Sequence, residues 1–280
     1  MALSAGQDLS LLVVSFGAGL LGALAGVGGG LIIVPVLTLW FGVDVRLAAG
    51  ASIVSVIATS SGAAVAYLRE GWANLRIATF LQLATVIGAI CGALVVQDVP
   101  TSALLLTLAI VLLFSAAAQL VRLADEPGAG PTDTDRRLRL EGSYFSLRLG
   151  RTVAYGAQRI VPGFLVMLAA GALSGLLGIG SGALKVLAMD GLMRLPLKVS
   201  SATSNFMIGV TAAASVGIYL SRGLVDARLA APVTLGVLGG ALVGARLLPR
   251  LTNRQVRLLF IPVLLVIAAE TLLRALGVAL

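Results

Sequence analysis

The sequence contains no histidine and a single cysteine, Cys91, which lies within an apolar run. Without histidine there is no Ser-His-Asp triad, no imidazole proton relay and no histidine metal ligand. One cysteine likewise excludes a disulfide framework and a cysteine-rich metal site. The Gly-Lys-Ser/Thr end of an ATP-binding loop is also missing, which argues against an ATP-driven pump. We therefore expect no enzymatic activity, no catalytic residues, no metal and no cofactor.

Charged residues are scarce as well. They make up 11% of the 280 residues, whereas 59% are hydrophobic, and the mean hydropathy is +1.05. Soluble domains carry about a quarter charged residues, so the expected solvent of this chain is a lipid bilayer. The net charge of +8 comes from arginines in short loops between apolar runs, where membrane topology places them. Nucleic-acid binding is therefore not expected.

The apolar residues form ten segments in two sets of five. The segments run approximately over 9–25, 31–43, 47–68, 75–96 and 101–123, then over 162–177, 183–195, 199–220, 229–247 and 256–276. A membrane-spanning helix needs about 20 residues, and the first two segments of each set are shorter. Each short pair meets at a glycine-rich stretch and forms either two short crossing helices or a re-entrant pair. The predicted fold class is all-α, a polytopic bundle of membrane helices.

Residues 124–160 differ from both sets because they are rich in charge, proline and glycine. They are predicted to be an aqueous linker between a first membrane unit, 1–123, and a second, 161–280. Within the linker, residues 137–148 alternate polar and apolar around Gly142-Ser143, which is a β-hairpin signal. An interfacial segment is the alternative.

The two sets of segments repeat at one spacing. Many identical residues recur after 152 positions without a gap, which indicates an internal repeat of the kind found in secondary transporters. The matching pairs are Gly26/Gly178, Gly28/Gly180, Gly30/Gly182, Ser52/Ser204, Thr59/Thr211, Tyr67/Tyr219, Gly71/Gly223, Arg76/Arg228, Gly88/Gly240 and Gly92/Gly244.

Lysine and arginine positions predict the orientation. If all ten segments cross, fifteen of these residues fall on the side of the linker and four on the other side, leaving Lys185 within the membrane. If each short pair is one crossing, the split is 12 against 7. The positive-inside rule favours the first arrangement, a cytoplasmic linker and two inverted repeats over parallel repeats.

The two glycine-rich stretches are the first candidate site. A helix that begins there points its free N–H groups and its positive dipole end into the break, which suits an oxyanion. The alternative is that the glycines only let helices pack closely. The predicted substrate-binding residues at the breaks are Gly28, Gly29, Gly30, Gly180, Ser181 and Gly182.

Polar side chains near the breaks complete the predicted site. Lys185 follows the second break within an apolar segment, and it either faces the substrate, snorkels, or pairs with Asp190. Hydroxyls and amides on the third segment of each repeat either bind substrate or hold helices together. The predicted ligands of this kind are Ser52, Ser204 and Asn205. Asp190 and Glu270 are the candidate carboxylates for proton coupling.

The stretch Gly26-Val27-Gly28-Gly29-Gly30-Leu31-Ile32-Ile33-Val34-Pro35, followed by Ala49-Gly50-Ala51-Ser52, resembles the sulfite exporter TauE/SafE family of bacterial membrane proteins. The second copy of the stretch is weaker, because Ser181 replaces the middle glycine, Leu187 stands in place of Pro35 and Lys185 adds a charge.

The resemblance implies export of small sulfur-containing anions, such as sulfite, sulfoacetate or related organosulfonates, across the bacterial inner membrane. An anion channel and a non-transporting membrane scaffold are the alternatives. The expected partners are the lipid bilayer and a small anionic substrate, and exposed Gly/Ala faces allow a homodimer without requiring one.

Overall fold

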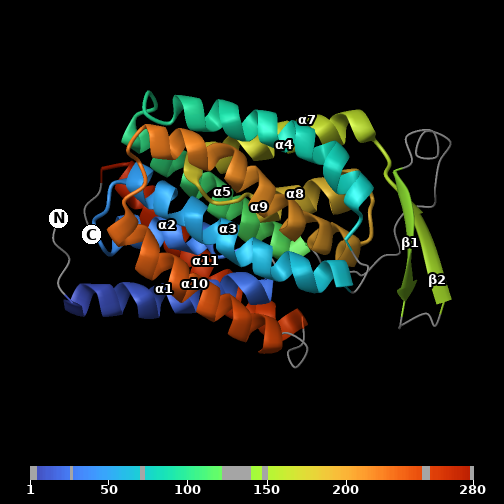
Figure 1. The fold of residues 1–280 in the computed structure, drawn as a ribbon, viewed down its shortest axis with the longest axis horizontal. Helices are drawn as coiled ribbons and strands as arrows, with labels where there is room; N and C mark the ends of the chain where they lie inside the picture. Colours follow the sequence, from blue (N-terminus) through green and yellow to red (C-terminus); the bar gives the residue numbers. More distant parts are fainter. Residues whose placement is uncertain are drawn as a thin grey trace.

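The structure, a computed structural model, describes residues 5–25, 28–69, 73–121, 140–146, 151–247 and 253–277. Helices dominate it (Figure 1). The first half contains α1 (Ala5–Ala25), α2 (Gly30–Leu39), α3 (Val45–Arg69), α4 (Leu75–Val95) and α5 (Thr101–Val121). Two strands follow, β1 (Glu141–Ser146) and β2 (Arg151–Gly156). The second half contains α7 (Ile160–Leu177), α8 (Gly182–Leu187), the π-helix η1 (Ala188–Leu192), α9 (Leu197–Ser221), α10 (Ala227–Leu247) and α11 (Asn253–Ala275).

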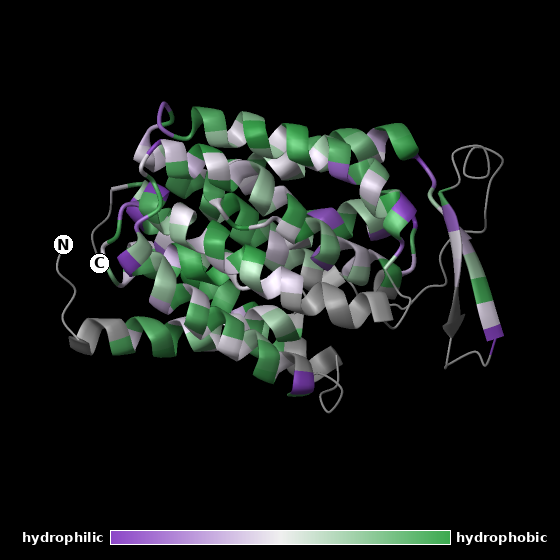
Figure 2. Ribbon diagram, in the orientation of Figure 1, coloured by the Kyte–Doolittle hydropathy of each residue, from purple (hydrophilic) through white to green (hydrophobic). Residues whose placement is uncertain are grey.

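Among the residues that the structure describes, six helices are long and apolar enough to cross a membrane, namely α4, α5, α7, α9, α10 and α11. Hydrophobic residues run along the bundle, and many hydrophilic residues lie toward its two ends (Figure 2). Large apolar side chains such as Leu83 and Leu165 are 60% exposed on the outside, which suits contact with lipid rather than water. These observations confirm the prediction of an all-α polytopic membrane bundle.

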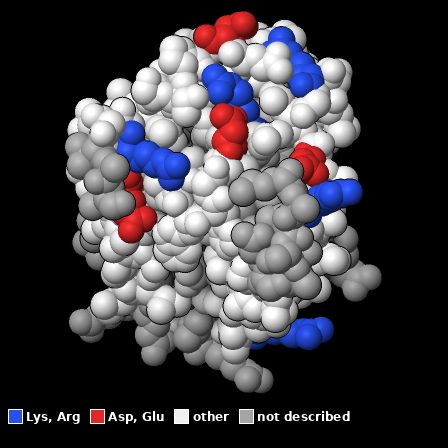
Figure 3. All heavy atoms as spheres, turned by 90° about the vertical axis from the view of Figure 1, so that its left-hand side faces the viewer, with Lys and Arg blue, Asp and Glu red and all other residues white. Residues whose placement is uncertain are grey.

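The two ends of the bundle can be told apart by what lies there. Helix α1 begins and α11 ends at one end, here called the terminal end, and the β-hairpin extends from the other, here called the hairpin end (Figure 1). At the terminal end Arg274 donates to the carbonyl of Thr38 at 2.6 Å, and Arg46 donates to the carbonyl of Val99 at 2.6 Å. Acidic and basic side chains are interspersed on this end (Figure 3).

Helices of the first half pack in pairs with helices of the second half. The bounds of α3 and α9, and those of α4 and α10, differ by 152 at both ends. Helix α1 packs along α10 while α4 packs along α7, so each half supplies one helix to each of these pairs. Helix α1 begins at the terminal end, whereas α7 begins at the hairpin end (Figure 1).

Glycines four residues apart bring α4 and α7 into close contact. A side chain at Gly88 would collide with the backbone of Leu168, and one at Gly175 would collide with the backbone of Ala89. Small residues at this spacing let membrane helices approach until their backbones touch. The pair α4–α7 therefore holds α4 firmly beside the second glycine-rich break, which directly follows α7.

A β-hairpin does lie in the region between the two halves, but the prediction of its turn was wrong. Strands β1 and β2 are antiparallel, with Glu141 opposite Gly156 and Ser146 opposite Arg151. Gly142 therefore lies within β1, and the connection falls at 147–150, outside the described residues. A Cβ atom at Gly142 would lie 2.5 Å from the hydroxyl of Tyr155. This glycine accommodates a neighbouring aromatic ring and does not form a turn.

Candidate functional site

Both glycine-rich stretches interrupt helices. Helix α1 ends at Ala25 and α2 begins at Gly30, while α7 ends at Leu177 and α8 begins at Gly182. Gly28 and Gly180 have φ angles of 81° and 70°, in the left-handed region that glycine adopts readily. Ser181 also has a positive φ, 45°, which is uncommon for a residue with a side chain.

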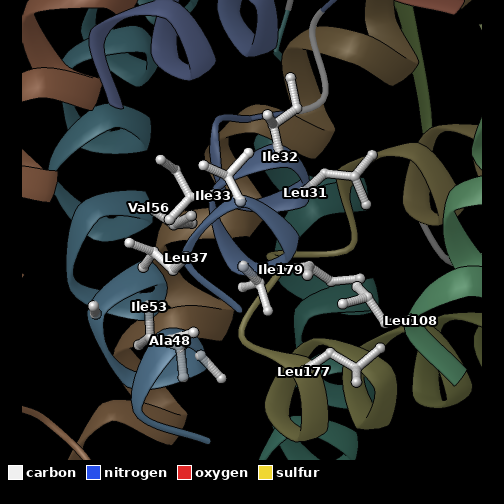
Figure 4. Packing of buried hydrophobic residues seen from close by; sticks show 14 of the residues in the cluster. Leu31, Ile32, Ile33, Leu37, Ala48, Ile53, Val56, Leu108, Leu177 and Ile179 are labelled. Atoms are coloured by element: carbon white, nitrogen blue, oxygen red, sulfur yellow. The ribbon is translucent and has the colours of Figure 1, made fainter. Parts of the chain in front are cut away.

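The two breaks lie against each other in the middle of the bundle. Ser52 Oγ donates to the carbonyl of Gly178 at 2.7 Å, and a Cβ atom at Gly30 would lie 3.3 Å from that same carbonyl oxygen. Figure 4 shows Ile179 of the second break close to α2, in the core cluster that also contains Leu31 and Ile33. Two stretches separated by 152 residues are thus brought together, as a shared site requires.

The N-terminus of α8 presents free donors in the second break. The amides of Gly182 and Ala183 make no backbone hydrogen bond among the described residues. At the first break, the carbonyls one turn before Gly30 and Leu31 belong to residues 26 and 27, outside the described residues. The hydroxyl of Ser181 is also unpartnered among the described residues, and this side chain is 3% exposed. Such groups are costly in a membrane interior unless a ligand or water satisfies them.

Lys185 lies on α8 and is fully buried, with 0% exposure. Its Nζ donates to Thr211 Oγ1 on α9 at 2.8 Å. The snorkelling interpretation is therefore wrong, because the ammonium group points to the protein interior. Asp190 lies partly buried in η1 and is engaged in an interaction. The described hydrogen-bond partner of Lys185 is an uncharged hydroxyl.

Two residues of α4 join Lys185 and Thr211, and sequence reasoning missed both. Thr211 Oγ1 lies 3.3 Å from Thr85 Oγ1 and 3.0 Å from the side-chain amide of Gln82. Turning that amide lets its oxygen accept from both threonines and its nitrogen donate to the carbonyl of Met207. The available signal was a glutamine in an apolar segment, because polar side chains within the membrane usually face a functional interior. We call Gln82, Thr85, Lys185 and Thr211 the α4–α8–α9 polar cluster.

The predicted hydroxyl and amide ligands hold the backbone near the breaks. Ser204 Oγ donates to the carbonyl of Gly182 at 3.2 Å, and Ser52 bonds Gly178 as described above. Asn205 donates from Nδ2 to the carbonyl of Ser201, one turn earlier in its own helix. All three are buried, and each donates to a backbone carbonyl.

Glu270 is not brought to the breaks. Its Oε2 accepts a hydrogen bond of 3.4 Å from Trp40 Nε1 at the terminal end. Trp40 follows α2, whose ten residues separate it from Gly30 by about 15 Å along the helix axis. The other candidate coupling carboxylate, Asp190, follows Lys185 by five residues in the chain.

The comparison with known families decides what kind of protein this is. Residues 11–271 match the pattern of the family described as sulfite exporter TauE/SafE. The chain belongs to the TauE/SafE family.

Relatives of this TauE/SafE chain include three proteins of Bacillus subtilis (strain 168), each described as a probable membrane transporter protein. YdhB is 27% identical over 84% of this chain and 88% of its own length. YunE is 25% identical over 93% of this chain and 95% of its own length, and YjnA is 26% identical over 93% and 98%. No solved structure matches the chain.

The TauE/SafE match spans both breaks and the whole α4–α8–α9 polar cluster. Together with six apolar helices of membrane-spanning length, it identifies this chain as a multi-pass membrane transporter. The match says nothing about which residues bind the transported molecule, so that assignment depends on the geometry above.

Proposed function

We propose that this transporter exports small sulfur-containing anions, such as sulfite, sulfoacetate or related organosulfonates, across the bacterial inner membrane. One observation carries the proposal. A fully buried lysine, Lys185, follows the second helix break by three residues, and that break packs against the first one through Gly178. A positive side chain close to a helix N-terminus in a low-dielectric interior favours an anion.

The direction of transport follows from the membrane potential. An inside-negative membrane drives an anion outward by about 2.3 kcal/mol per charge per 100 mV. Export can then proceed without a coupling ion, whereas uptake would need one. We propose export for this reason, with Asp190 as the residue to examine first for proton coupling.

The proposed mechanism is alternating access by two inverted repeats, 1–123 and 161–280, joined by a cytoplasmic linker, 124–160. Two observations support it: helix bounds recur at the 152-residue spacing, and the first helices of the two halves begin at opposite ends. Rocking one repeat against the other would expose the breaks first to the hairpin end and then to the terminal end. In this proposal the hairpin end is cytoplasmic.

The test is efflux of radiolabelled sulfite from proteoliposomes that contain the purified protein and carry a defined membrane potential. The expected result is saturable efflux that accelerates when the inside is made negative. In the Lys185→Ala variant we expect efflux to fall by about 100-fold, the effect of removing a buried charged ligand.

The matched control is Ile33→Ala, which changes the position 152 residues earlier on α2. It removes apolar packing but no charge, so saturable efflux should persist. Unchanged flux and affinity in Lys185→Ala would rule out Lys185 as an anion ligand. Non-saturating flux with single-channel currents would replace the transporter with an anion channel, and absence of flux for every anion tested would favour a scaffold.

A further inference from the structure

We propose that Gln82 and Thr85 on α4, with Thr211 on α9, are direct ligands of the transported oxyanion and determine which anion is accepted beside Lys185. The proposal rests on the anion transport proposed above and deepens it. It moves the centre of the site from the glycine-rich breaks to the α4–α8–α9 polar cluster.

The first reason is an incomplete set of hydrogen bonds around Lys185. An ammonium group has three N–H donors, and Thr211 Oγ1 is the partner of Nζ among the described residues. The side chain is 0% exposed, so bulk water cannot serve the other donors. A buried ammonium group that lacks acceptors is strongly unfavourable, and an oxyanion supplies both acceptors and the opposite charge.

The second reason is the convergence of donors from three helices. Thr85 and Gln82 of α4 and Lys185 of α8 all meet Thr211 of α9 at distances between 2.8 and 3.3 Å. Two hydroxyls, a carboxamide and an ammonium group carry N–H and O–H donors, and the oxygens of an anion can accept hydrogen bonds from several of them at once. In the structure these groups bond one another, and the hydroxyls of Thr211 and Thr85 also lie within hydrogen-bond distance of the carbonyls of Met207 and Gln82. An oxyanion entering the cluster would replace these contacts.

The third reason is position. Ile208 lies between the breaks, because Cβ atoms at Gly28 and Gly180 would lie 3.9 and 3.0 Å from its side chain. Thr211 follows Ile208 by three residues, so it lies on the same face of α9 about 4.5 Å further along. An anion held by the cluster would therefore lie about one helical turn along α9 from the breaks.

The fourth reason comes from the other half of the chain. The positions 152 residues away from Lys185, Thr85 and Gln82 are Ile33, Val237 and Thr234. Ile33 and Val237 are fully buried and apolar. Thr59, the counterpart of Thr211, donates to carbonyls of its own helix. Thr211 likewise donates to the carbonyl of Met207, but it also contacts Lys185, Thr85 and Gln82 on other helices. Apolar side chains fill the positions equivalent to Lys185 and Thr85, so packing alone does not require these two residues to be polar.

The experiment measures the affinity of purified protein for radiolabelled sulfite in Thr85→Val and Gln82→Leu, which keep side-chain size and remove the donors. We expect the dissociation constant to rise by about tenfold or more in each, the usual effect of losing a hydrogen bond to a charged group. Thr85→Ser keeps the hydroxyl and should stay within about threefold of the natural protein, a change too small for a lost hydrogen bond.

A selectivity measurement separates a ligand from a residue that only supports the fold. Competition by methanesulfonate and nitrate is compared with that of sulfite, and the α4 variants should change the ratio of the three affinities. The matched controls Thr234→Val and Thr59→Val, in the other half, should leave both affinity and ratio unchanged. If Gln82→Leu fails to yield folded protein, Gln82→Asn withdraws the amide by one methylene and should still alter the ratio.

The outcomes separate this inference from the proposed function. If the natural protein binds no sulfur oxyanion, the proposed function fails. If it binds sulfite and Lys185→Ala abolishes binding while Thr85→Val and Gln82→Leu bind with unchanged affinity and ratio, the proposed function stands and the α4 ligands are overturned.

Discussion

The two glycine-rich breaks share a left-handed glycine, Gly28 or Gly180, but differ at the next residue, which is right-handed at Gly29 and left-handed at Ser181, and in their side chains. On the first side, α2 is a regular helix of ten residues, and Gly30 to Thr38 are all buried. On the second side, α8 has six residues before the chain continues as the π-helix η1, and the position of Ile33 is taken by Lys185. Short π-helical turns are frequent at functional sites. The first break is organised by apolar packing and the second by a polar cluster.

The bundle has two hydrophobic cores with different side chains. Met167, Met189, Met193 and Met207 are all fully buried in the core around η1 and the hairpin end. The core around α2 is built mainly from leucine, isoleucine and valine. Methionine is flexible and adapts its shape, whereas branched side chains are stiff. Leu177 and Ile179 of the second break pack in this same α2 core, so the more adaptable core begins beyond α8, at η1.

Placing the lysine of the second break at the equivalent position of the first should cause the largest loss of stability. Ile33→Lys places an ammonium group among fully buried apolar side chains of α2, α3 and the second break. We expect destabilisation by several kcal/mol, because no acceptor awaits the charge. Size-exclusion chromatography in detergent should show little monodisperse protein. A normal yield with unchanged thermal unfolding would mean that the first break also tolerates a cation.

Replacing the left-handed glycine of each break by alanine should destabilise the second break more than the first. Gly180→Ala brings Cβ to 3.0 Å from Ile208 and 3.2 Å from Val56, whereas Gly28→Ala meets Ile208 only at 3.9 Å. Both changes carry the cost of a positive φ, about 1–2 kcal/mol, and Gly180→Ala adds the close contacts. Thermal unfolding should show a larger loss of stability for Gly180→Ala. Equal losses would indicate that the neighbours of Gly180 move aside freely.

The paired serines should differ because their hydrogen bonds differ. Ser52→Ala removes a 2.7 Å bond that joins α3 to the carbonyl of Gly178 in the other half, whereas Ser204→Ala removes a 3.2 Å bond to Gly182. We expect about 1–3 kcal/mol of lost stability for Ser52→Ala, since it leaves a carbonyl acceptor without its partner, and less for Ser204→Ala. The comparison is made by thermal unfolding, and the reverse order would contradict it.

The smallest expected effect is a gain. Thr234 Oγ1 on α10 is buried and has no hydrogen-bond partner among the described residues. Thr234→Val has nearly the same shape and removes that hydroxyl, so stability should rise by about 1 kcal/mol. Its counterpart in the polar cluster, Gln82, should show no such gain on replacement by leucine. A loss of stability in Thr234→Val would show that water or another ligand serves this hydroxyl.

Much of the fold could be predicted from composition and pattern. Lipid has no hydrogen bonds to offer, so spanning segments must be helical and must read as long apolar runs. The same constraint made the glycine-rich breaks conspicuous and drew attention to Lys185. The hairpin was harder, because Gly142 can equally well mark a turn or leave room for a neighbouring side chain. Only the position of Tyr155 in the folded chain distinguishes these two uses.

By itself, the sequence determined the medium of this protein, the approximate bounds of its helices and the two breaks that interrupt them. These properties depend on local hydropathy and on backbone hydrogen bonding, which neighbouring residues decide. Only the tertiary structure decided that Lys185 meets Thr211, and that Gln82 and Thr85 join them. Those contacts connect residues up to 129 positions apart. They exist because glycine packing holds α4 beside α7, an arrangement that no local pattern in the sequence reveals.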